Sequence, residues 1–539
     1  MKILYLAFTL LSVKFTLGQT PDWTGLKLFA GRATDYGVGI YIDNHDNYYL
    51  TGTMFSPSFL GGDSLMEGCK AIFYPQSNRL NGFLLRYDSN KILNLVLTLN
   101  PGTYGEPRVD NAGNIIVSGI FDYGASRDGF LRKYSSSGNI LWTKLLQSYA
   151  TGQSDDVITS LDIFNDGSIV ISGFSYGNQV SLFGTIISGP SNFIAKLNAL
   201  GDIQWINNFT STLGLGVYKV KFDKDGDIII AGNERNIGTN SVDGMIGKLS
   251  GTTGNLVWKK NFISSGGPFI NSIGSFSNKY VFGGTFGGQM KIGDSTFNSR
   301  GQIDIVFLQT DSAGNLIWVK KGGSSGRDIV YSLMCDQAGN TLATGGFSNG
   351  FQFQSAILPA KGYTDVYILS LNSNGSLLWI KNGGSSIPGH DDLSYEEYGS
   401  GIAVDSKNQI QVIGTTIGAG NFGSLIFNAP ENIKQNAFWL TLGKKNNSDI
   451  VNYPCNRDSS FFLSVFPNPF HEMLSIKNSQ NKMVKYDIQL YNTLGQSLYT
   501  KTDNTVTMTI NDWRTFPSGI YFLKVKIGNY KQTFKIVKQ

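Results

Sequence analysis

A two-hairpin unit that recurs about every sixty residues constrains the fold more than any other feature of this sequence. Its first hairpin joins two strands of alternating apolar residues through a turn rich in Asp, Asn and Gly, which favour tight hairpin turns. Seven copies begin at Ile40, Pro107, Leu161, Val220, Ser275, Leu333 and Ile402. Period-two alternation predicts strands with one buried face, so the repeated region is predicted to be all-β.

The second hairpin of each unit ends in a strand that carries tryptophan. These residues are Trp142, Trp205, Trp258, Trp318 and Trp379, and Leu95 or Leu97 takes the place in the first copy. Two hairpins make a four-stranded sheet that cannot bury both faces alone, so neighbouring units must stack on it. Four-stranded sheets repeated around an axis form a β-propeller. We expect the tryptophans to pack between sheets rather than to form sugar-binding platforms.

The seventh copy lacks a tryptophan strand, and the missing strand lies at the other end of the chain. The segment beginning at Asp22 matches the tryptophan strands through Trp23. The predicted fold is therefore all-β: a seven-bladed β-propeller of four-stranded blades closed by the N-terminal strand, followed by a small C-terminal β-sandwich. Closure would hide sheet edges that invite aggregation. An open stack of sheets is the alternative.

Residues 19–442 resemble the bacterial β-propeller repeat family (SBBP-like) of large secreted proteins. The Asp-x-x-Gly-Asn turns and the Gly-x-Trp-x-Lys strand ends carry this resemblance. It implies a fold and little about activity, because propellers include both enzymes and binding proteins.

Residues 1–18 are predicted to be a secretory signal peptide. Lys2 precedes a mostly apolar run from Ile3 to Val13, and small residues end at Gly18, so we expect cleavage between Gly18 and Gln19. A buried N-terminal strand is the alternative. The apolar run is too short to span a bilayer, and we expect no transmembrane span.

The repeat ends at Leu442, and residues 443–463 are predicted to be a polar linker before a small β-domain at 464–539. The domain has ten Lys or Arg against four Asp or Glu from position 465, out of a net charge of +5, so the rest of the chain is close to neutral. A near-neutral body gives no electrostatic reason to expect nucleic acid as a partner.

Residues 465–539 resemble the type A C-terminal sorting domain of the type IX secretion system of the Bacteroidota. The carrying residues are Pro467, Asn468, Pro469, Asn492, Gly495, Gly519, Tyr521, Lys535 and Lys538. The resemblance implies recognition by the type IX machinery and passage across the outer membrane. Release or attachment at the cell surface would follow. An ordinary β-domain packed on the propeller is the alternative.

Residues suited to chemistry are few. The three histidines have no zinc-site spacing, and no cofactor or catalytic residue is assigned. Asp223, Asp225 and Asp227 alternate like the start of a calcium loop, although a plain hairpin turn explains them better. The run from His390 to Glu397 is acidic, which is more typical of a solvated loop than of paired catalytic carboxylates. Three cysteines, Cys69, Cys335 and Cys455, allow one disulfide of undetermined pairing.

These features favour a secreted or surface-displayed propeller that binds a glycan or a protein over an enzyme. The longest departures from the repeat, residues 54–80 and 387–399, are the first places to look for a site. The alternative is a secreted hydrolase, glycosidase or peptidase-like, with carboxylates on the propeller face. Asp110, Asp223, Asp336 and Asp405 recur by repeat and could ring the channel, or they could cap turns.

Overall fold

The computed structural model describes residues 20–30, 35–55, 65–67, 70–73, 80–99, 105–122, 127–148, 155–210, 216–236, 241–386, 396–428, 435–444, 463–466, 470–478, 482–511, 513, 515–528 and 530–538. Strands are the regular elements throughout these ranges, as predicted, and they contain no helix long and apolar enough to cross a membrane. The predicted cleavage site at Gly18 and Gln19 and the motif residues Pro467 to Pro469 lie outside them.

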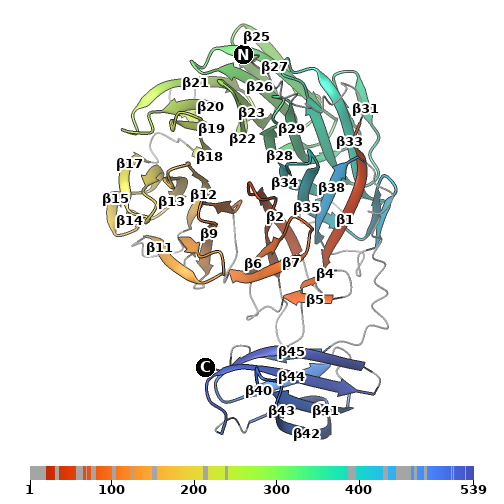
Figure 1. Cartoon of the computed structure of the whole chain (residues 1–539). Coiled ribbons are helices and arrows are strands. Elements are labelled where there is room, and N and C mark those ends of the chain that lie inside the picture. Colours follow the sequence, from red (N-terminus) through yellow and green to blue (C-terminus); the bar gives the residue numbers. More distant parts are fainter. Residues whose placement is uncertain are drawn as a thin grey trace, which may run out of the picture. The chain divides into compact units, whose positions relative to one another are not determined.

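The chain divides into two compact units, one with strands β1 to β38 and one with β39 to β45. In the first unit, the described residues form seven antiparallel sheets arranged around a centre (Figure 1). This arrangement is a β-propeller, and every sheet contains its own set of four antiparallel strands.

The first three sheets each use four strands that follow the order of the chain. They consist of β2 (Asp35–Ile42), β3 (Tyr48–Phe55), β6 (Leu80–Tyr87) and β7 (Leu93–Leu99); β8 (Arg108–Val109), β9 (Ile115–Asp122), β10 (Arg127–Tyr134) and β11 (Ile140–Ser148); and β12 (Asp156–Ile163), β13 (Ile169–Ser175), β16 (Ser191–Leu197) and β17 (Ile203–Thr210).

The next three sheets repeat this pattern. They consist of β18 (Gly216–Phe222), β19 (Ile228–Asn236), β20 (Ser241–Leu249) and β21 (Leu256–Ser264); β22 (Phe269–Phe276), β23 (Lys279–Phe286), β26 (Asp304–Asp311) and β27 (Leu316–Gly323); and β28 (Asp328–Cys335), β29 (Thr341–Ser348), β32 (Thr364–Leu371) and β33 (Leu377–Ser385).

The seventh sheet combines the two ends of the unit. It consists of β34 (Tyr398–Val404), β35 (Ile410–Ile417), β38 (Gln435–Gly443) and β1 (Asp22–Ala30). β1 is antiparallel to β38, with Asp22 opposite Gly443 and Phe29 opposite Ala437. The N-terminal strand therefore occupies the place that the tryptophan strand takes in other sheets.

In five sheets a further hairpin extends the four predicted strands to six. The connection between the second and third strands of one sheet folds into a hairpin that pairs with the fourth strand of the preceding sheet. These hairpins are β4–β5 (Leu65–Glu67 and Lys70–Phe73), β14–β15 (Gln179–Leu182 and Thr185–Ser188), β24–β25 (Gln289–Ile292 and Ser295–Asn298), β30–β31 (Phe351–Phe353 and Ala356–Leu358) and β36–β37 (Ala419–Phe422 and Leu425–Asn428).

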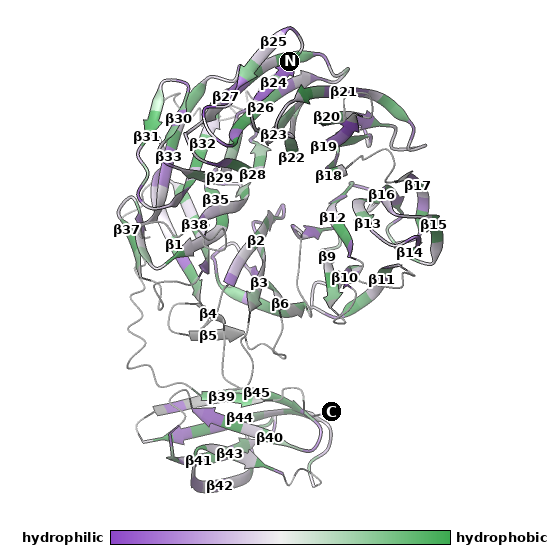
Figure 2. Ribbon diagram, turned by 180° about the vertical axis from the view of Figure 1, so that it is seen from behind, coloured by the Kyte–Doolittle hydropathy of each residue, from purple (hydrophilic) through white to green (hydrophobic). Residues whose placement is uncertain are grey.

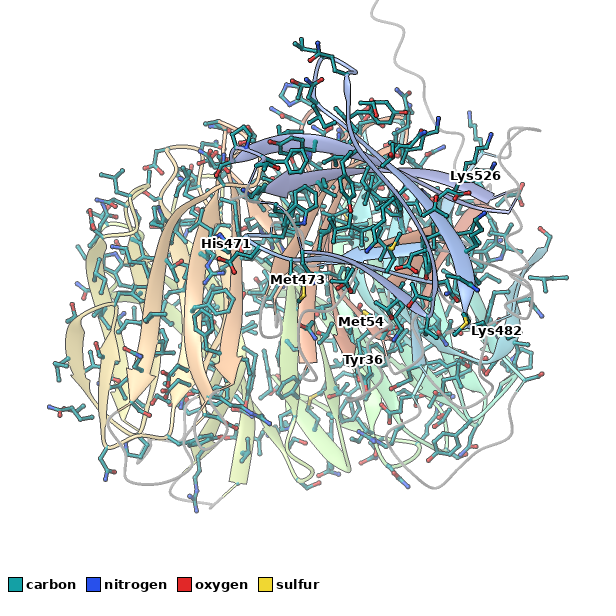
Figure 3. All side chains as sticks on the ribbon, turned by 90° about the horizontal axis from the view of Figure 1, so that it is seen from below. Tyr36, Met54, His471, Met473, Lys482 and Lys526 are labelled. Atoms are coloured by element: carbon teal, nitrogen blue, oxygen red, sulfur yellow. The ribbon has the colours of Figure 1, made fainter. Side chains whose placement is uncertain are left out.

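The apolar core lies between neighbouring sheets. Strands such as β29, β32 and β35 are buried along their whole length, and apolar residues run through the sheets in Figure 2. Met54, which β3 contributes beside β2 and its Tyr36, is fully buried in one such layer (Figure 3). Burial on both faces explains how units with weak individual cores become stable together.

The tryptophans pack between sheets, as predicted. The indole N–H of Trp205, Trp258 and Trp318 donates to a turn carbonyl of the next sheet, at Gly251 (3.2 Å), Ser312 (3.0 Å) and Ser373 (3.1 Å). In the first copy, Leu95 and Leu97 take this place against Gly138.

The C-terminal unit is a sandwich of two antiparallel sheets around one core that contains the buried Trp513. One sheet has β39 (Leu463–Phe466), β40 (Leu474–Asn478) and β43 (Thr507–Ile510). The other has β42 (Ser497–Thr505), β41 (Val484–Tyr491), β44 (Gly519–Ile527) and β45 (Tyr530–Lys538). On β44 the inward side chains alternate with exposed ones such as Lys526 (Figure 3), as a half-buried strand requires.

Candidate functional site: the channel cavity

A cavity of about 580 Å³ lies where the first strands of all seven sheets of the propeller converge. Each of β2, β12, β18, β22, β28 and β34 contributes to its wall, and the segment at β8 completes it. The volume falls in the range of small-molecule sites. Every sheet of the propeller therefore contributes residues to this cavity.

One side of the cavity is charged. Arg108 donates through one nitrogen to Glu106 (2.8 Å) and through another to Asp162 (2.9 Å), and Lys219 pairs with Glu106 at 3.1 Å. Burial opposes ionisation of Glu106, but the charges of Lys219 and Arg108 outweigh it and hold the pKa of Glu106 well below its ordinary value. Burial opposes ionisation of Asp162 too, and nearby cations again hold its pKa below the ordinary value. Both carboxylates are therefore ionised and bound to cations.

Lys221 follows Lys219 on the same face of β18 and also lines the cavity. Its positive charge acts to lower the pKa of Asp162 and of the Cys335 thiol. Among the described residues, however, Lys221 makes no hydrogen bond or ion pair. Lys221 is the cation of the wall that has no bonded carboxylate.

The rest of the wall is apolar or neutral. It includes Phe164 and Phe222, whose ring centroids lie 5.3 Å apart, and the half-exposed Phe276. The remaining apolar lining residues are Ile40, Ile273, Leu333, Met334, Ile402 and Val404. The cavity therefore combines charged and apolar residues in its wall, the combination expected of a site for an amphiphilic small molecule.

The periodic aspartates cap turns instead of lining a catalytic ring. Asp110 accepts from the backbone N–H of Ala112 (3.0 Å) and Asn114 (2.9 Å). Asp336 and Asp405 accept in the same way from residues two and four positions later. These carboxylates fix a tight turn, with Gly113 at a φ of +77° that a side chain would strain.

Asp223, Asp225 and Asp227, the weak calcium candidates, are bonded to protein groups. Asp223 accepts from the ammonium of Lys248 (2.8 Å) and the hydroxyl of Tyr280 (2.8 Å), and its other oxygen caps the turn. Lys248 also reaches Asp227 at 3.0 Å, while Asp225 pairs with Lys224. Within the described residues no group of three or more His, Cys, Asp or Glu could hold a metal ion. A lysine ammonium takes the position between these carboxylates, and calcium binding stays an untested prediction.

The acidic loop before the seventh sheet is described only at its end. Glu396 pairs with Arg327 at 3.0 Å. Glu397 is buried and accepts from the backbone of Ser385 and Ile417, yet burial raises its pKa to about 7. His390, Asp391 and Asp392 lie outside the described residues, as does most of the range 54–80.

Sequence reasoning missed a set of buried carboxyls at the junctions between sheets. Ile303 and Arg327 form a parallel bridge, which brings the next residues, Asp304 and Asp328, side by side with no exposed surface. Asp328 Oδ2 accepts from Ser324 N at 2.6 Å, whereas Oδ1 of both carboxyls has no hydrogen-bond partner among the described residues. Burial raises the pKa of Asp328 to about 7.

Asp365 repeats this arrangement at the next junction. Burial raises its pKa to about 6, and a Cβ added to Gly384 would lie 2.6 Å from its carboxylate and 3.0 Å from that of Glu397. The runs Gly-Gly-Ser-Ser at 322–325 and 383–386, each followed by a buried acid, were the sequence signal for these junctions.

Several sorting-motif residues have clear structural roles. Asn492 caps the turn to Gln496 (2.9 Å), and Gly495 adopts a φ of +79° in that turn. The Tyr521 hydroxyl donates to the carbonyl of Pro517 at 2.6 Å. The ammonium of Lys538 donates to Phe516, while Gly519 and Lys535 lie on the paired strands β44 and β45.

Comparisons with known proteins were made by sequence, by structure and against family models. No curated protein matches it in sequence. Among solved structures, it is similar to the β-propeller domain of the Trilobed protease from Pyrococcus furiosus (8% identity, TM-score 0.41, covering 78% of this chain and 97% of that chain). It is also similar to quinohemoprotein alcohol dehydrogenase from Comamonas testosteroni (9% identity, TM-score 0.40, 83% and 79%). A mutant Trypanosoma rangeli sialidase displaying trans-sialidase activity is 8% identical (TM-score 0.33, 83% and 85%).

At this level of similarity these structures say nothing about activity. The match at the other end of the chain is of a different kind, because it comes from a family model that aligns with a defined segment, residues 464–539. That family is the secretion system C-terminal sorting domain. Residues 464–539 are a type IX secretion C-terminal sorting domain, carried behind a β-propeller.

Proposed function

We propose that this chain is exported by the type IX secretion system of a member of the Bacteroidota and displays its propeller at the cell surface or releases it, as a glycan-binding protein. The sorting domain implies export and interaction with the type IX machinery. Display or release, and the ligand, are the parts that we add.

Export is tested by deleting residues 464–539 in the native host. We expect the truncated chain to remain inside the outer membrane, while the full chain reaches the surface or the medium. A variant with Tyr486→Phe, which changes one hydroxyl in the domain core, serves as a control that should still be exported. Extracellular truncated chain would contradict the proposal.

We further propose that the seven sheets form one closed ring with β1 as the closing strand. The support comes from bonds between the last sheet and the first: Ser400 donates to the carbonyl of Gly37 (2.7 Å), and Tyr48 donates to Asp405 (3.0 Å). An experimental structure with another number of sheets, or with β1 detached from β38, would contradict this architecture.

The observation that carries the binding proposal is the channel cavity of about 580 Å³, whose wall holds both charged and apolar residues. Sugars present both hydroxyls and apolar C–H faces, so such a wall suits them, and the volume fits one or two sugar residues rather than a protein surface. The full chain should bind specific sugars on a glycan array, with affinity confirmed by calorimetry. Absence of binding to every sugar tested would contradict the proposal.

A hydrolase is the second candidate, but the ionised carboxylates of the cavity make this function less suitable. A glycosidase needs one carboxyl with a raised pKa to act as the acid. Glu106 and Asp162 are instead held ionised by Arg108 and neighbouring lysines. Bound glycan should therefore be recovered intact after prolonged incubation, whereas release of new reducing ends would favour the hydrolase.

A further inference from the structure

We infer that the ligand of the channel cavity is a sugar with a singly charged acidic group, a carboxylate or a sulfate ester, and that Lys221 binds this group. The inference rests on the proposed glycan binding and specifies its chemical class. It follows from the charges of the lining residues, from the alternation of side chains along β18, and from the apolar residues that also line the cavity.

One cation of the lining has no bonded carboxylate among the described residues. Glu106 and Asp162 are matched by Arg108 and Lys219 through ion pairs of 2.8 to 3.1 Å. Of the other charged lining residues, Asp223 shares Lys248 with Asp227, and Lys224 pairs with Asp225. The lining itself therefore holds four cations (Arg108, Lys219, Lys221 and Lys224) and three carboxylates (Glu106, Asp162 and Asp223), and Lys221 is the cation of this set that forms no ion pair within the described ranges.

The position of Lys221 directs its ammonium into the cavity. On β18 the side chains alternate, so Val220 and Phe222 are buried in the core while Lys219 and Lys221 share the other face and line the cavity. Asp162 accepts from Arg108 (2.9 Å) and from the backbone N–H of Phe222 (2.9 Å), whereas Lys221 acts on it through its charge without a hydrogen bond. The Lys221 ammonium, which has no bonded acceptor among the described residues, is therefore a good donor for an anionic group of a ligand.

The apolar residues of the lining indicate what the anion is attached to. Phe276, Met334 and Val404 line the cavity from β22, β28 and β34, and their side chains are at least partly exposed. A pyranose ring presents apolar C–H groups to such a surface while its acidic substituent reaches Lys221. A small inorganic anion would leave this apolar surface unused.

Calorimetry on the full chain tests the inference with glucuronate, galacturonate and N-acetylglucosamine 6-sulfate against glucose and N-acetylglucosamine. Acidic sugars should bind at least about tenfold more tightly than their neutral counterparts, and Lys221→Met should weaken their binding about 10- to 100-fold, the range of a charge-assisted hydrogen bond. Lys221→Arg should retain most of the affinity. Lys260→Met is the matched control, since that exposed lysine on β21 lies outside the cavity lining and its replacement should leave binding unchanged.

The outcomes separate the two proposals. Equal binding of neutral and acidic sugars, or an unchanged affinity in Lys221→Met with an unaltered melting temperature, overturns the inference and leaves glycan binding intact. Binding that depends on Lys221 but is seen only with a peptide C-terminal carboxylate overturns the sugar class. No binding of any sugar overturns the proposed function itself. The carboxylate and sulfate arms then identify which acidic group is preferred.

Discussion

Replacing Asp328 by Asn should make the propeller more stable at neutral and alkaline pH. The Asp328 carboxyl is fully buried beside Asp304, and burial raises its pKa to about 7 from an ordinary value of 3.8. An acid whose pKa is raised by folding holds more protons when folded than when unfolded. The contribution of Asp328 to stability is therefore highest below about pH 4, falls as the pH rises towards 7, and is constant above that.

The magnitude follows from the shift. A difference of about three pKa units corresponds to roughly 4 kcal/mol of free energy of unfolding lost between pH 4 and pH 7. Asn stays neutral at every pH and can accept from Ser324 as the carboxyl does, while its amide can donate to the Asp304 oxygen that lacks a partner. Asp328→Asn should gain up to that amount above pH 7 and little at pH 4.

The assay is urea unfolding followed by tryptophan fluorescence at pH 4.5 to 8.5, for the wild type and the variant. The wild-type midpoint should fall across this range, and the variant midpoint should fall less. Asp311→Asn is the matched control, since that exposed aspartate caps a turn in which Asn372 does the same in the next sheet.

Hydrogen bonds lower the pKa of Asp311, so its replacement cannot remove an alkaline loss of stability. If Asp328→Asn destabilised the protein equally at pH 4.5 and 8.5, the carboxyl would be ionised in the folded state and the reasoning refuted.

Three further predictions concern single side chains. Trp318→Ala should lower the free energy of unfolding by about 3–5 kcal/mol, because the indole fills the space between two sheets; a urea series giving less than about 1 kcal/mol would contradict this packing role. Lys248→Met should destabilise by about 3–5 kcal/mol at neutral pH, since it leaves the Asp223 carboxylate without its counter-charge; the wild type should melt alike with calcium or chelator, and a chelator effect would revive the calcium hypothesis. Tyr486→Phe removes a hydroxyl bonded to Asn478 (2.9 Å) and should lower only the unfolding transition of the C-terminal unit, by about 1 kcal/mol; a shift of both transitions in calorimetry would contradict this.

The strands of the repeat and their turns could be predicted from the sequence because local signals determine them. Alternating apolar residues and turns such as Asp110 to Asn114 fix a hairpin without reference to distant residues. The role of Trp258 and its equivalents followed from periodicity, since equivalent positions in a repeat meet equivalent neighbours.

The outer hairpins are harder to predict from the sequence than the strands of the repeat. β14 and β15 have four residues each, and an isolated hairpin of that size is marginal in water. Only the exposed edge of β11 makes it stable. A local signal existed in Phe183 and Gly184, both at positive φ as a tight hairpin turn requires, but the partner strand belongs to another repeat.

The cavity and the buried carboxyl pairs depend on distances across the fold. Glu106 lies just before β8, whereas Asp162 and Lys219 lie on strands of two other sheets. Nothing in their spacing shows that Arg108 joins Glu106 to Asp162 or that Lys219 pairs with Glu106. Asp304 and Asp328 likewise become neighbours only through a bridge between two sheets. Charge pairing of this kind follows from the assembled structure, not from any one segment.

The hairpins that pass from one sheet to the edge of its predecessor mean that a sequence repeat and a structural sheet are out of phase. Excising one sixty-residue repeat would remove the outer hairpin that covers the edge of the preceding sheet. The hairpin β30–β31, for example, covers β27 in this way. Gain or loss of a single repeat during evolution, or in an engineered array, would therefore leave a bare edge unless the repeat that follows supplied a replacement. A chain should therefore be divided inside a sheet, after the outer hairpin and before the third strand, so that each fragment keeps the hairpin that covers its last complete sheet.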